Sequence, residues 1–300
     1  MIRERMCCAV VAAALLGVAP FGGASAQTQS EAIVVTGRTP EHTQAFVDRV
    51  AAAPEAANQL ARWDREICTS VVGLPARQGQ FLADRIAQRA FALGLQPGAP
   101  GCHGNIAVFV TADSDAMARR LFEEDEGLFA YRSENNVATL GQAAFEQFLN
   151  SDRPVRWWHV AHAVGADGIA LSGDASSGGV SNAAVARSRG SRLSSDVRQD
   201  LARVIIIVDA RRAGSVQIAA LADYISMVAL AQVDPWADTA SYPTILNLFA
   251  ANPPGGAVTG LSEWDLAYLD GLYAATRYAV SAQQQEREIA RRMLARDGRS

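Results

Sequence analysis

The chain has 300 residues, of which 49% are hydrophobic and 19% charged, and its formal net charge is −4. This composition is typical of a globular protein with a sizeable core, and the mild acidity argues against general nucleic-acid binding. The sequence contains no lysine. That absence excludes mechanisms that depend on a lysine, such as a Schiff base, a phosphate-loop lysine or a Ser–Lys dyad.

The first 26 residues have the pattern of a secretory signal peptide. Two arginines precede an apolar run over residues 6–18, and Ala-Ser-Ala at 24–26 forms a cleavage site. We therefore expect cleavage after Ala26 and export to the periplasm or the medium of a Gram-negative bacterium. No later apolar run is long enough to cross a bilayer, so no transmembrane segment is expected in the mature chain.

A short β-prone segment follows, which begins at Glu31 and ends at Arg38 with the sequence Glu-Ala-Ile-Val-Val-Thr-Gly-Arg. It resembles the TonB box at the mature N-terminus of TonB-dependent receptors, although the chain lacks the many alternating strands of a receptor barrel. The resemblance implies a protein partner that takes this segment as an added strand. The alternatives are a disordered tail and a first edge strand. Residues 27–40 are expected to be a flexible N-terminal segment.

Periodicity then predicts an α+β fold, a mixed β-sheet packed by helices, in a single domain over 41–300. Helical spacing covers 43–50, 56–67, 78–93, 141–149, 217–232, 262–277 and 280–296, and Asp113 is the expected N-cap of a helix that ends at Phe122. β-Branched and aromatic runs predict strands over 68–73, 105–111, 154–160 and 204–208. The glycine- and serine-rich stretch 165–200 is expected to be a mobile loop.

Cys68 and Cys102 are the only cysteines after the leader. An even pair in an oxidising compartment predicts a disulfide. Such a bond closes a loop of about 33 residues and stabilises the fold by roughly 3–4 kcal/mol in the chain-entropy model. The alternative is a pair of buried free thiols.

The stretch 204–278 contains a pattern of residues that is found in a known protein family. Leu261-Ser262-Glu263-Trp264-Asp265 and the later pair Leu272-Tyr273 resemble the segment that follows the metal site in zincin metallopeptidases. The resemblance implies a zincin-like C-terminal half. Read without a family, Ser262 and Asp265 form a helix capping box.

The metal ligands of a zincin are missing from the helix that should carry them. A His-Glu-x-x-His motif supplies two zinc ligands one turn apart and a carboxylate that activates water. Ala222 and Ser226 stand at the two histidine positions, and Asp223 stands at the glutamate position. His159 and His162 are a possible replacement pair, but residues three apart on a strand face opposite sides. We therefore expect no metal site and no cofactor.

The favoured interpretation is an exported, non-catalytic binding or structural protein on a degenerate zincin-like scaffold. Its predicted binding cleft lies between strand 154–160, loop 165–200 and helix 217–232. The residues predicted to line that cleft are Arg156, Trp158, His159, Asp223, Tyr224 and Ser226.

The alternative is a periplasmic hydrolase that acts on a peptide or a cell-wall polymer. Its acid–base groups would be Asp223, Glu263, Asp265 and His159. Such an enzyme needs two of these groups in one cleft, about 5–10 Å apart, so their arrangement in space separates the two hypotheses.

Overall fold

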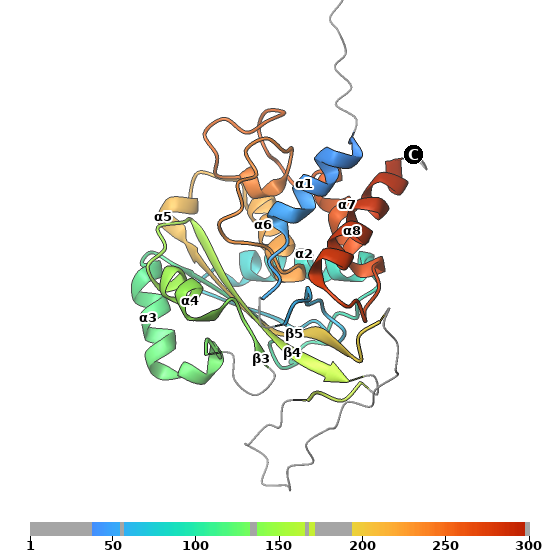
Figure 1. Ribbon diagram of the computed structural model, residues 1–300. Coiled ribbons are helices and arrows are strands. Elements are labelled where there is room, and N and C mark those ends of the chain that lie inside the picture. Colours follow the sequence, from blue (N-terminus) through green and yellow to red (C-terminus); the bar gives the residue numbers. More distant parts are fainter. Residues whose placement is uncertain (1–37, 55–56, 133–136, 166–167, 172–193, 298–300) are drawn as a thin grey trace, which may run out of the picture. The chain divides into compact units, whose positions relative to one another are not determined.

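The computed structural model describes residues 38–54, 57–132, 137–165, 168–171 and 194–297, which Figure 1 shows as ribbon. The expected signal peptide, the segment from Glu31 up to Arg38 and most of loop 165–200 lie outside these residues, so they stay predictions. The described residues all belong to one unit that starts at Arg38.

A mixed sheet organises the described residues. Its five strands are β1 (Thr69–Val72), β2 (Ile106–Thr111), β3 (Val137–Ala138), β4 (Val155–Gly165) and β5 (Val197–Asp209). The spatial order is β1-β2-β5-β4-β3, with β1, β2 and β5 parallel and the pairs β5–β4 and β4–β3 antiparallel. The expected α+β class with a mixed sheet is therefore confirmed.

Helices connect and cover the strands (Figure 1). The helices of the described part are α1 (Pro40–Val50), α2 (Ala76–Ala92), α3 (Ser114–Glu124), α4 (Gly141–Leu149), α5 (Ala210–Ala213), α6 (Ile218–Leu230), α7 (Glu263–Ala274) and α8 (Ala282–Asp297), with short 3₁₀ turns at Glu126–Leu128 and Ile245–Asn247. Asp113 is the N-cap of α3, and Ser262 and Asp265 form the capping box of α7, as expected. None of these helices is long and apolar enough to cross a membrane.

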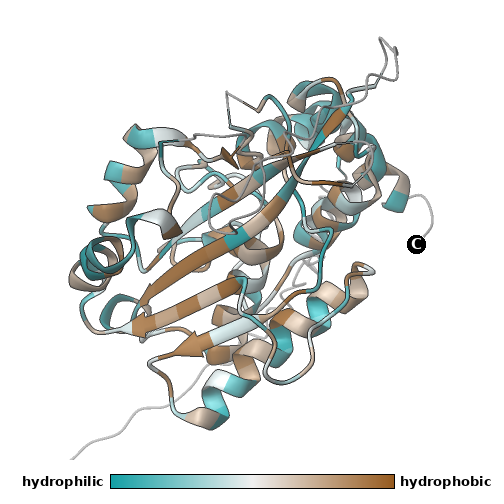
Figure 2. Cartoon of the chain, turned by 90° about the horizontal axis from the view of Figure 1, so that it is seen from below, coloured by the Kyte–Doolittle hydropathy of each residue, from teal (hydrophilic) through white to brown (hydrophobic). Residues whose placement is uncertain are grey.

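The sheet separates two hydrophobic cores because successive side chains of a strand point to opposite faces. Trp157 and Ile206 belong to the larger core, which also contains the buried side chains of α1, α2, α6, α7 and α8. Trp158 and Ile205 belong to a smaller aromatic core under α3 and α4. Both faces of the central strands are thus buried, and these strands are brown along most of their length in Figure 2.

Two expected elements differ from the structure. No helix forms over 57–67, where the chain is irregular and Asn58 has a positive φ of 47°. This segment instead lies against the end of α6, where Trp63 Nε1 donates to the Ala229 carbonyl at 2.8 Å. The loop expected over 165–200 is shorter, since β5 already begins at Val197 and pairs with β4 there.

The predicted disulfide between Cys68 and Cys102 is confirmed, with a Cα–Cα distance of 5.9 Å. It joins the residue before β1 to the turn that leads into β2. Asn105 strengthens the same junction, because its side chain accepts a hydrogen bond from Cys68 N and donates one to the Glu66 carbonyl.

Candidate functional site

The six residues predicted to line one cleft lie on both faces of the sheet. Arg156 and Trp158 point toward α3 and α4, where Trp158 Nε1 donates to the Phe129 carbonyl at 2.7 Å. His159 points the other way, with Nε2 2.7 Å from the Val228 carbonyl of α6. All six side chains are buried. The prediction of a shared cleft is therefore wrong, because strand alternation places the sheet between its two halves.

Asp223 connects three elements by charge and hydrogen bonds. Its oxygens accept from Arg89 Nε and Nη2 at 3.1 Å each, and Arg85 Nε lies 3.1 Å away. Both arginines are on α2, and the Leu261 amide donates to the same carboxylate at 3.3 Å. A Cβ at position 260 would lie 2.9 Å from Asp223 Oδ2, so the glycine there allows this approach. Asp223 thus ties α6 to α2 and to the segment that enters α7.

The other α6 residues at the expected zinc positions face inward. Ala222 and Ser226 are both completely buried, and Ser226 Oγ donates to the Ala222 carbonyl at 2.7 Å within the helix. The neighbouring Tyr224 stacks edge-on against Trp157 and Phe249. In the described part of the chain, no group of three His, Cys, Asp or Glu side chains could hold a metal ion.

Asp265 is buried within its own helix cap. It accepts hydrogen bonds from the Ile245 amide, from the Ser262 amide and hydroxyl, all at 2.7–2.8 Å, and from Thr244 at 2.5 Å. Burial raises the pKa of this carboxyl, although these hydrogen bonds favour its charged form. Its role is to hold the turn at 244–245 against the start of α7.

The four acid–base candidates do not share an open cleft. Glu263 is exposed on α7 and lies 3.6 Å from Arg296, whereas Asp265 and Asp223 occupy separate hydrogen-bond networks. His159 is buried against α6, and this burial lowers its pKa to about 4. Asp223 and Asp265 accept from the consecutive amides of Leu261 and Ser262, so they are neighbours, but both are buried and both already accept several hydrogen bonds. They therefore do not form an acid–base pair that is open to a substrate.

A groove of about 620 Å³ lies elsewhere on the molecule and was not predicted. Its walls come from residues 51–54 after α1, from α4, from the start of α8 and from the turn after α6. Six of its thirteen lining residues are alanines, so space remains where larger side chains would fill it. Trp236 is on the rim with 41% of its surface exposed. We call this feature the Trp236 groove.

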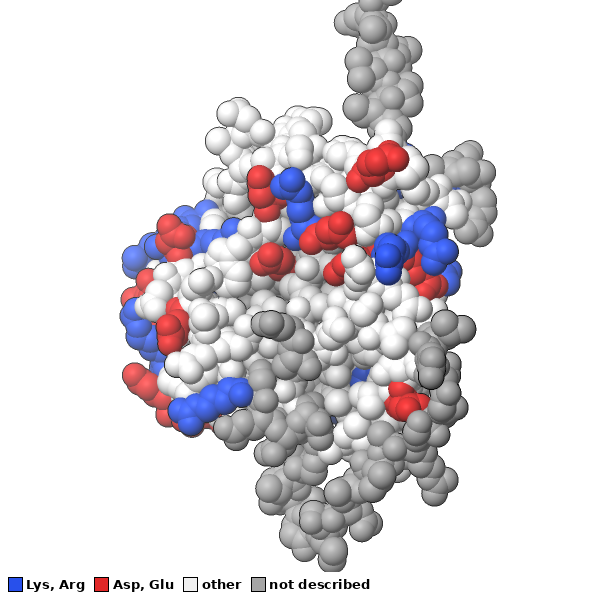
Figure 3. All heavy atoms as spheres, in the orientation of Figure 1, with Lys and Arg blue, Asp and Glu red and all other residues white. Residues whose placement is uncertain are grey.

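The Trp236 groove is acidic. Asp234 and Glu286 are its two charged lining residues, and no arginine or histidine lines it. Partial burial raises the pKa of Glu286, and the nearby charge of Asp48 on α1 raises it further. Acidic side chains also gather near the middle of the face drawn in Figure 3, between α1 and α4. The groove therefore presents negative charge that the described residues leave without an ion pair.

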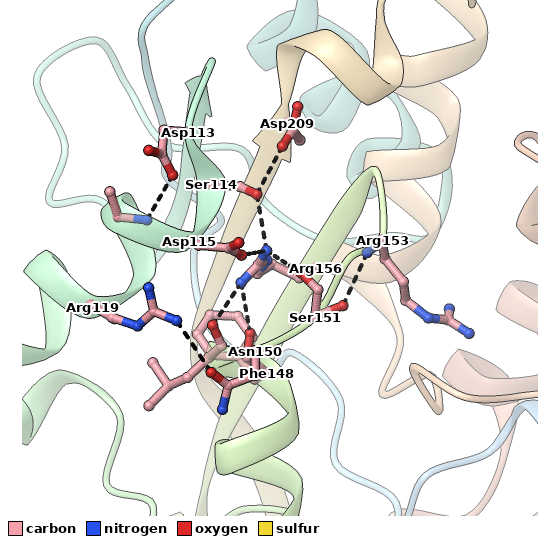
Figure 4. Close-up of polar contacts among 12 residues, drawn as sticks. Asp113, Ser114, Asp115, Arg119, Phe148, Asn150, Ser151, Arg153, Arg156 and Asp209 are labelled. Carbon is pink, nitrogen blue, oxygen red and sulfur yellow. Dashed lines mark hydrogen bonds and ion pairs between the residues drawn. The ribbon is translucent and has the colours of Figure 1, made fainter.

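A second polar cluster lies at the carboxyl ends of the parallel strands β2 and β5 (Figure 4). Ser114 Oγ donates to Asp209 Oδ2 at 3.0 Å and accepts from Arg156 Nη2 at 2.9 Å. Asp209 is the last residue of β5, and Ser114, the first residue of α3, comes three positions after the end of β2. Polar residues at the carboxyl ends of parallel strands commonly mark a ligand site in α/β proteins, but this cluster was not predicted.

Arg156 fills this cluster instead of leaving it open to a ligand. Its Nη1 donates to the carbonyls of Phe148 and Leu149 at 3.0 and 3.1 Å, and its Nη2 also contacts Asp115 and the Ser151 carbonyl (Figure 4). Arg156 is 2% exposed. The cluster therefore joins the N-terminus of α3 and the C-terminus of α4 to the sheet.

No family model, curated protein or solved structure matches this chain. The resemblance to zincins stays a prediction. What the protein does must follow from the chemistry of its own side chains.

Proposed function

We propose that the chain is an exported, non-catalytic binding protein whose ligand site is the Trp236 groove. The disulfide is compatible with a periplasmic or extracellular protein, because such bonds persist in oxidising compartments. The groove supports a binding role because it combines small apolar walls, an exposed tryptophan and a few polar groups.

The observation that carries the non-catalytic part is the environment of Asp223. A general base must be free to accept a proton from substrate or water. Both oxygens of Asp223 already accept from Arg89, and Arg85 and the Leu261 amide also face the carboxylate. On the proposed zincin-like scaffold, the position of the catalytic glutamate has become a structural cross-link.

Metal analysis and a peptidase assay test this proposal. Mature protein purified without chelators is expected to contain far less than about one zinc per chain, since Ala222 and Ser226 offer no good ligand. It is also expected to leave an unfolded protein such as casein uncleaved, with or without added Zn²⁺. A mock preparation from cells without the gene controls for contaminating peptidases.

Two outcomes would contradict the proposal. One is stoichiometric zinc that is lost in His159→Ala, which would restore a metal site at β4. The other is peptide hydrolysis that is lost in Asp223→Asn while the variant keeps its circular dichroism spectrum. Either result would favour the hydrolase alternative.

A further inference from the structure

The lining of the Trp236 groove points to the charge and shape of its ligand. We propose that the groove binds the basic side chain of an arginine or lysine residue in a peptide segment. This inference rests on the proposed binding function and names the ligand class.

The charge of the groove is negative, and no arginine of the described residues forms an ion pair with it. Asp234 Oδ1 accepts from the Trp236 amide at 2.8 Å, and neither Asp234 nor Glu286 forms an ion pair within the described part of the chain. Asp209 and Asp223, two carboxylates that are more deeply buried, each face an arginine. The groove thus lacks the cation that similar carboxylates elsewhere in this fold possess.

The surroundings of Glu286 disfavour its negative charge, so a bound cation would have a large effect on this side chain. Burial and the neighbouring Asp48 both disfavour its charged form, and Arg287 opposes them only in part. Burial raises the pKa of the Tyr268 hydroxyl, and the negative charge of Glu286 raises it further. That hydroxyl is buried and has no hydrogen-bond partner among the described residues. A cation in the groove would stabilise the charged form of Glu286, which burial and the charge of Asp48 otherwise disfavour.

The rim of the groove suits a guanidinium or an ammonium. The chain has five tryptophans, and the other four, Trp63, Trp157, Trp158 and Trp264, are at most 7% exposed. Trp236 is 41% exposed beside two carboxylates. An indole face attracts cations, and arginine most often. An anionic ligand would instead meet two like charges at close range.

The walls of the groove are suited to the aliphatic part of an arginine or lysine side chain. Alanine methyl groups from 51–53, α4 and α8 face the groove and match the methylene groups of arginine or lysine. The side-chain amides of Asn58 and Gln147 also line the groove, and both can pair with peptide groups that enter it. A metal ion is a poorer fit, because the described residues offer no group of three ligands.

Fluorescence titration can test the ligand class directly, because Trp236 is the exposed tryptophan. The probes are the peptide acetyl-Gly-Gly-Arg-Gly-Gly-amide and the same peptide with citrulline, which has the shape of arginine without its charge. We expect the arginine peptide to bind at least about tenfold more tightly, and its affinity to fall as salt rises. Trp236→Phe should abolish the fluorescence change and identify its source.

Three variants separate the groove from the rest of the surface. Glu286→Gln is expected to weaken binding of the arginine peptide by about fivefold or more, because it removes a half-buried charge. Ala143→Trp should abolish binding by filling the groove from α4. Glu123→Gln, an exposed charge on α3 outside the groove, is the matched control and should bind as the wild type does.

The results distinguish this inference from the proposed function. Equal binding of the arginine and citrulline peptides would overturn the cationic ligand and leave a binding role intact. Binding that survives both Glu286→Gln and Ala143→Trp would overturn the site. The inference would also be overturned if neither the arginine peptide nor acetyl-Gly-Gly-Lys-Gly-Gly-amide, a third probe, bound at low salt. The non-catalytic part of the proposed function would be overturned by the separate outcomes given above, stoichiometric zinc lost in His159→Ala or peptide hydrolysis lost in Asp223→Asn.

Discussion

Buried charged side chains of this protein each stabilise one junction between elements. Arg62, 7% exposed, donates to the carbonyls of Leu272, Tyr273 and Ala275 at the end of α7. Burial, with the nearby charge of Arg277, lowers the pKa of Arg62 to about 10, so it stays protonated at neutral pH. Because helix ends leave carbonyls without intrahelical donors, an arginine placed there satisfies several at once.

Arg156 gives the clearest stability prediction at this scale. Arg156→Lys keeps the charge but loses the planar group that reaches five acceptors, so buried carbonyls are left unpaired. We expect a loss of about 3 kcal/mol in the free energy of unfolding, measured by urea denaturation. Arg119→Lys on α3 is the control, since Arg119 makes one exposed side-chain hydrogen bond within the described residues, to Asn150. Equal stability of the two variants would contradict this role of Arg156.

His159 makes the stability of the fold dependent on pH. Its pKa is about 4 in the folded protein, against an ordinary value of 6.5, because burial disfavours the charged ring. Between these values the unfolded chain binds the proton and the folded chain does not, so stability falls as the pH falls from 6.5 to 4. The expected loss from this group is up to about 3 kcal/mol.

Urea denaturation at pH 7.5, 6, 5 and 4.5 measures this dependence. His159→Gln retains an amide that can donate to the Val228 carbonyl and does not titrate, so its unfolding free energy should change less over this range. His103→Gln is the control, because His103 is exposed and should leave the wild-type dependence unchanged. A His159→Gln profile identical to that of the wild type would contradict the assignment.

At the scale of elements, the disulfide fixes the start of β1 relative to the turn before β2. The double variant Cys68→Ala/Cys102→Ala is expected to lose roughly 3–4 kcal/mol of stability, because its unfolded chain is no longer constrained. Urea denaturation of the wild type with and without dithiothreitol should show the same difference. The double variant should not respond to dithiothreitol, and a response there would show that the reductant acts elsewhere.

The spacing of apolar residues predicted most helices and strands, because within each of them these residues recur at the period of one type of secondary structure. Helix α4 was predicted over 141–149, and the structure has it at Gly141–Leu149. The two failures have a shared cause. Residues 57–67 and the first half of β5 pair with each other, since Leu201 N donates to the Arg62 carbonyl and Arg198 contacts Asp64. Such contacts between distant segments leave no local signal in the sequence.

At the scale of the whole molecule, the class of fold was predictable but the site was not. The run over 204–208 identified the central strand, because only a strand buried on both faces is uniformly apolar. The Trp236 groove is formed by four segments that are far apart in the chain, and alanine is the commonest residue in its wall. An alanine in the sequence does not indicate a binding site. Asp234 and Glu286 can be recognised as an acidic pair only once the fold has brought them together.

The position of β5 also has a consequence for how the nascent chain reaches its native state. β5 is the last strand in the sequence, yet it lies in the middle of the sheet between β2 and β4. Until residue 209 has emerged, β2 and β4 each present an open, apolar edge, and such edges pair readily with other chains. Parallel pairing between strands that are far apart in the sequence is also intrinsically slow. A chain with this order of strands stays open to aggregation until its central strand has been made, so its folding yield should depend on protection from other chains up to that point.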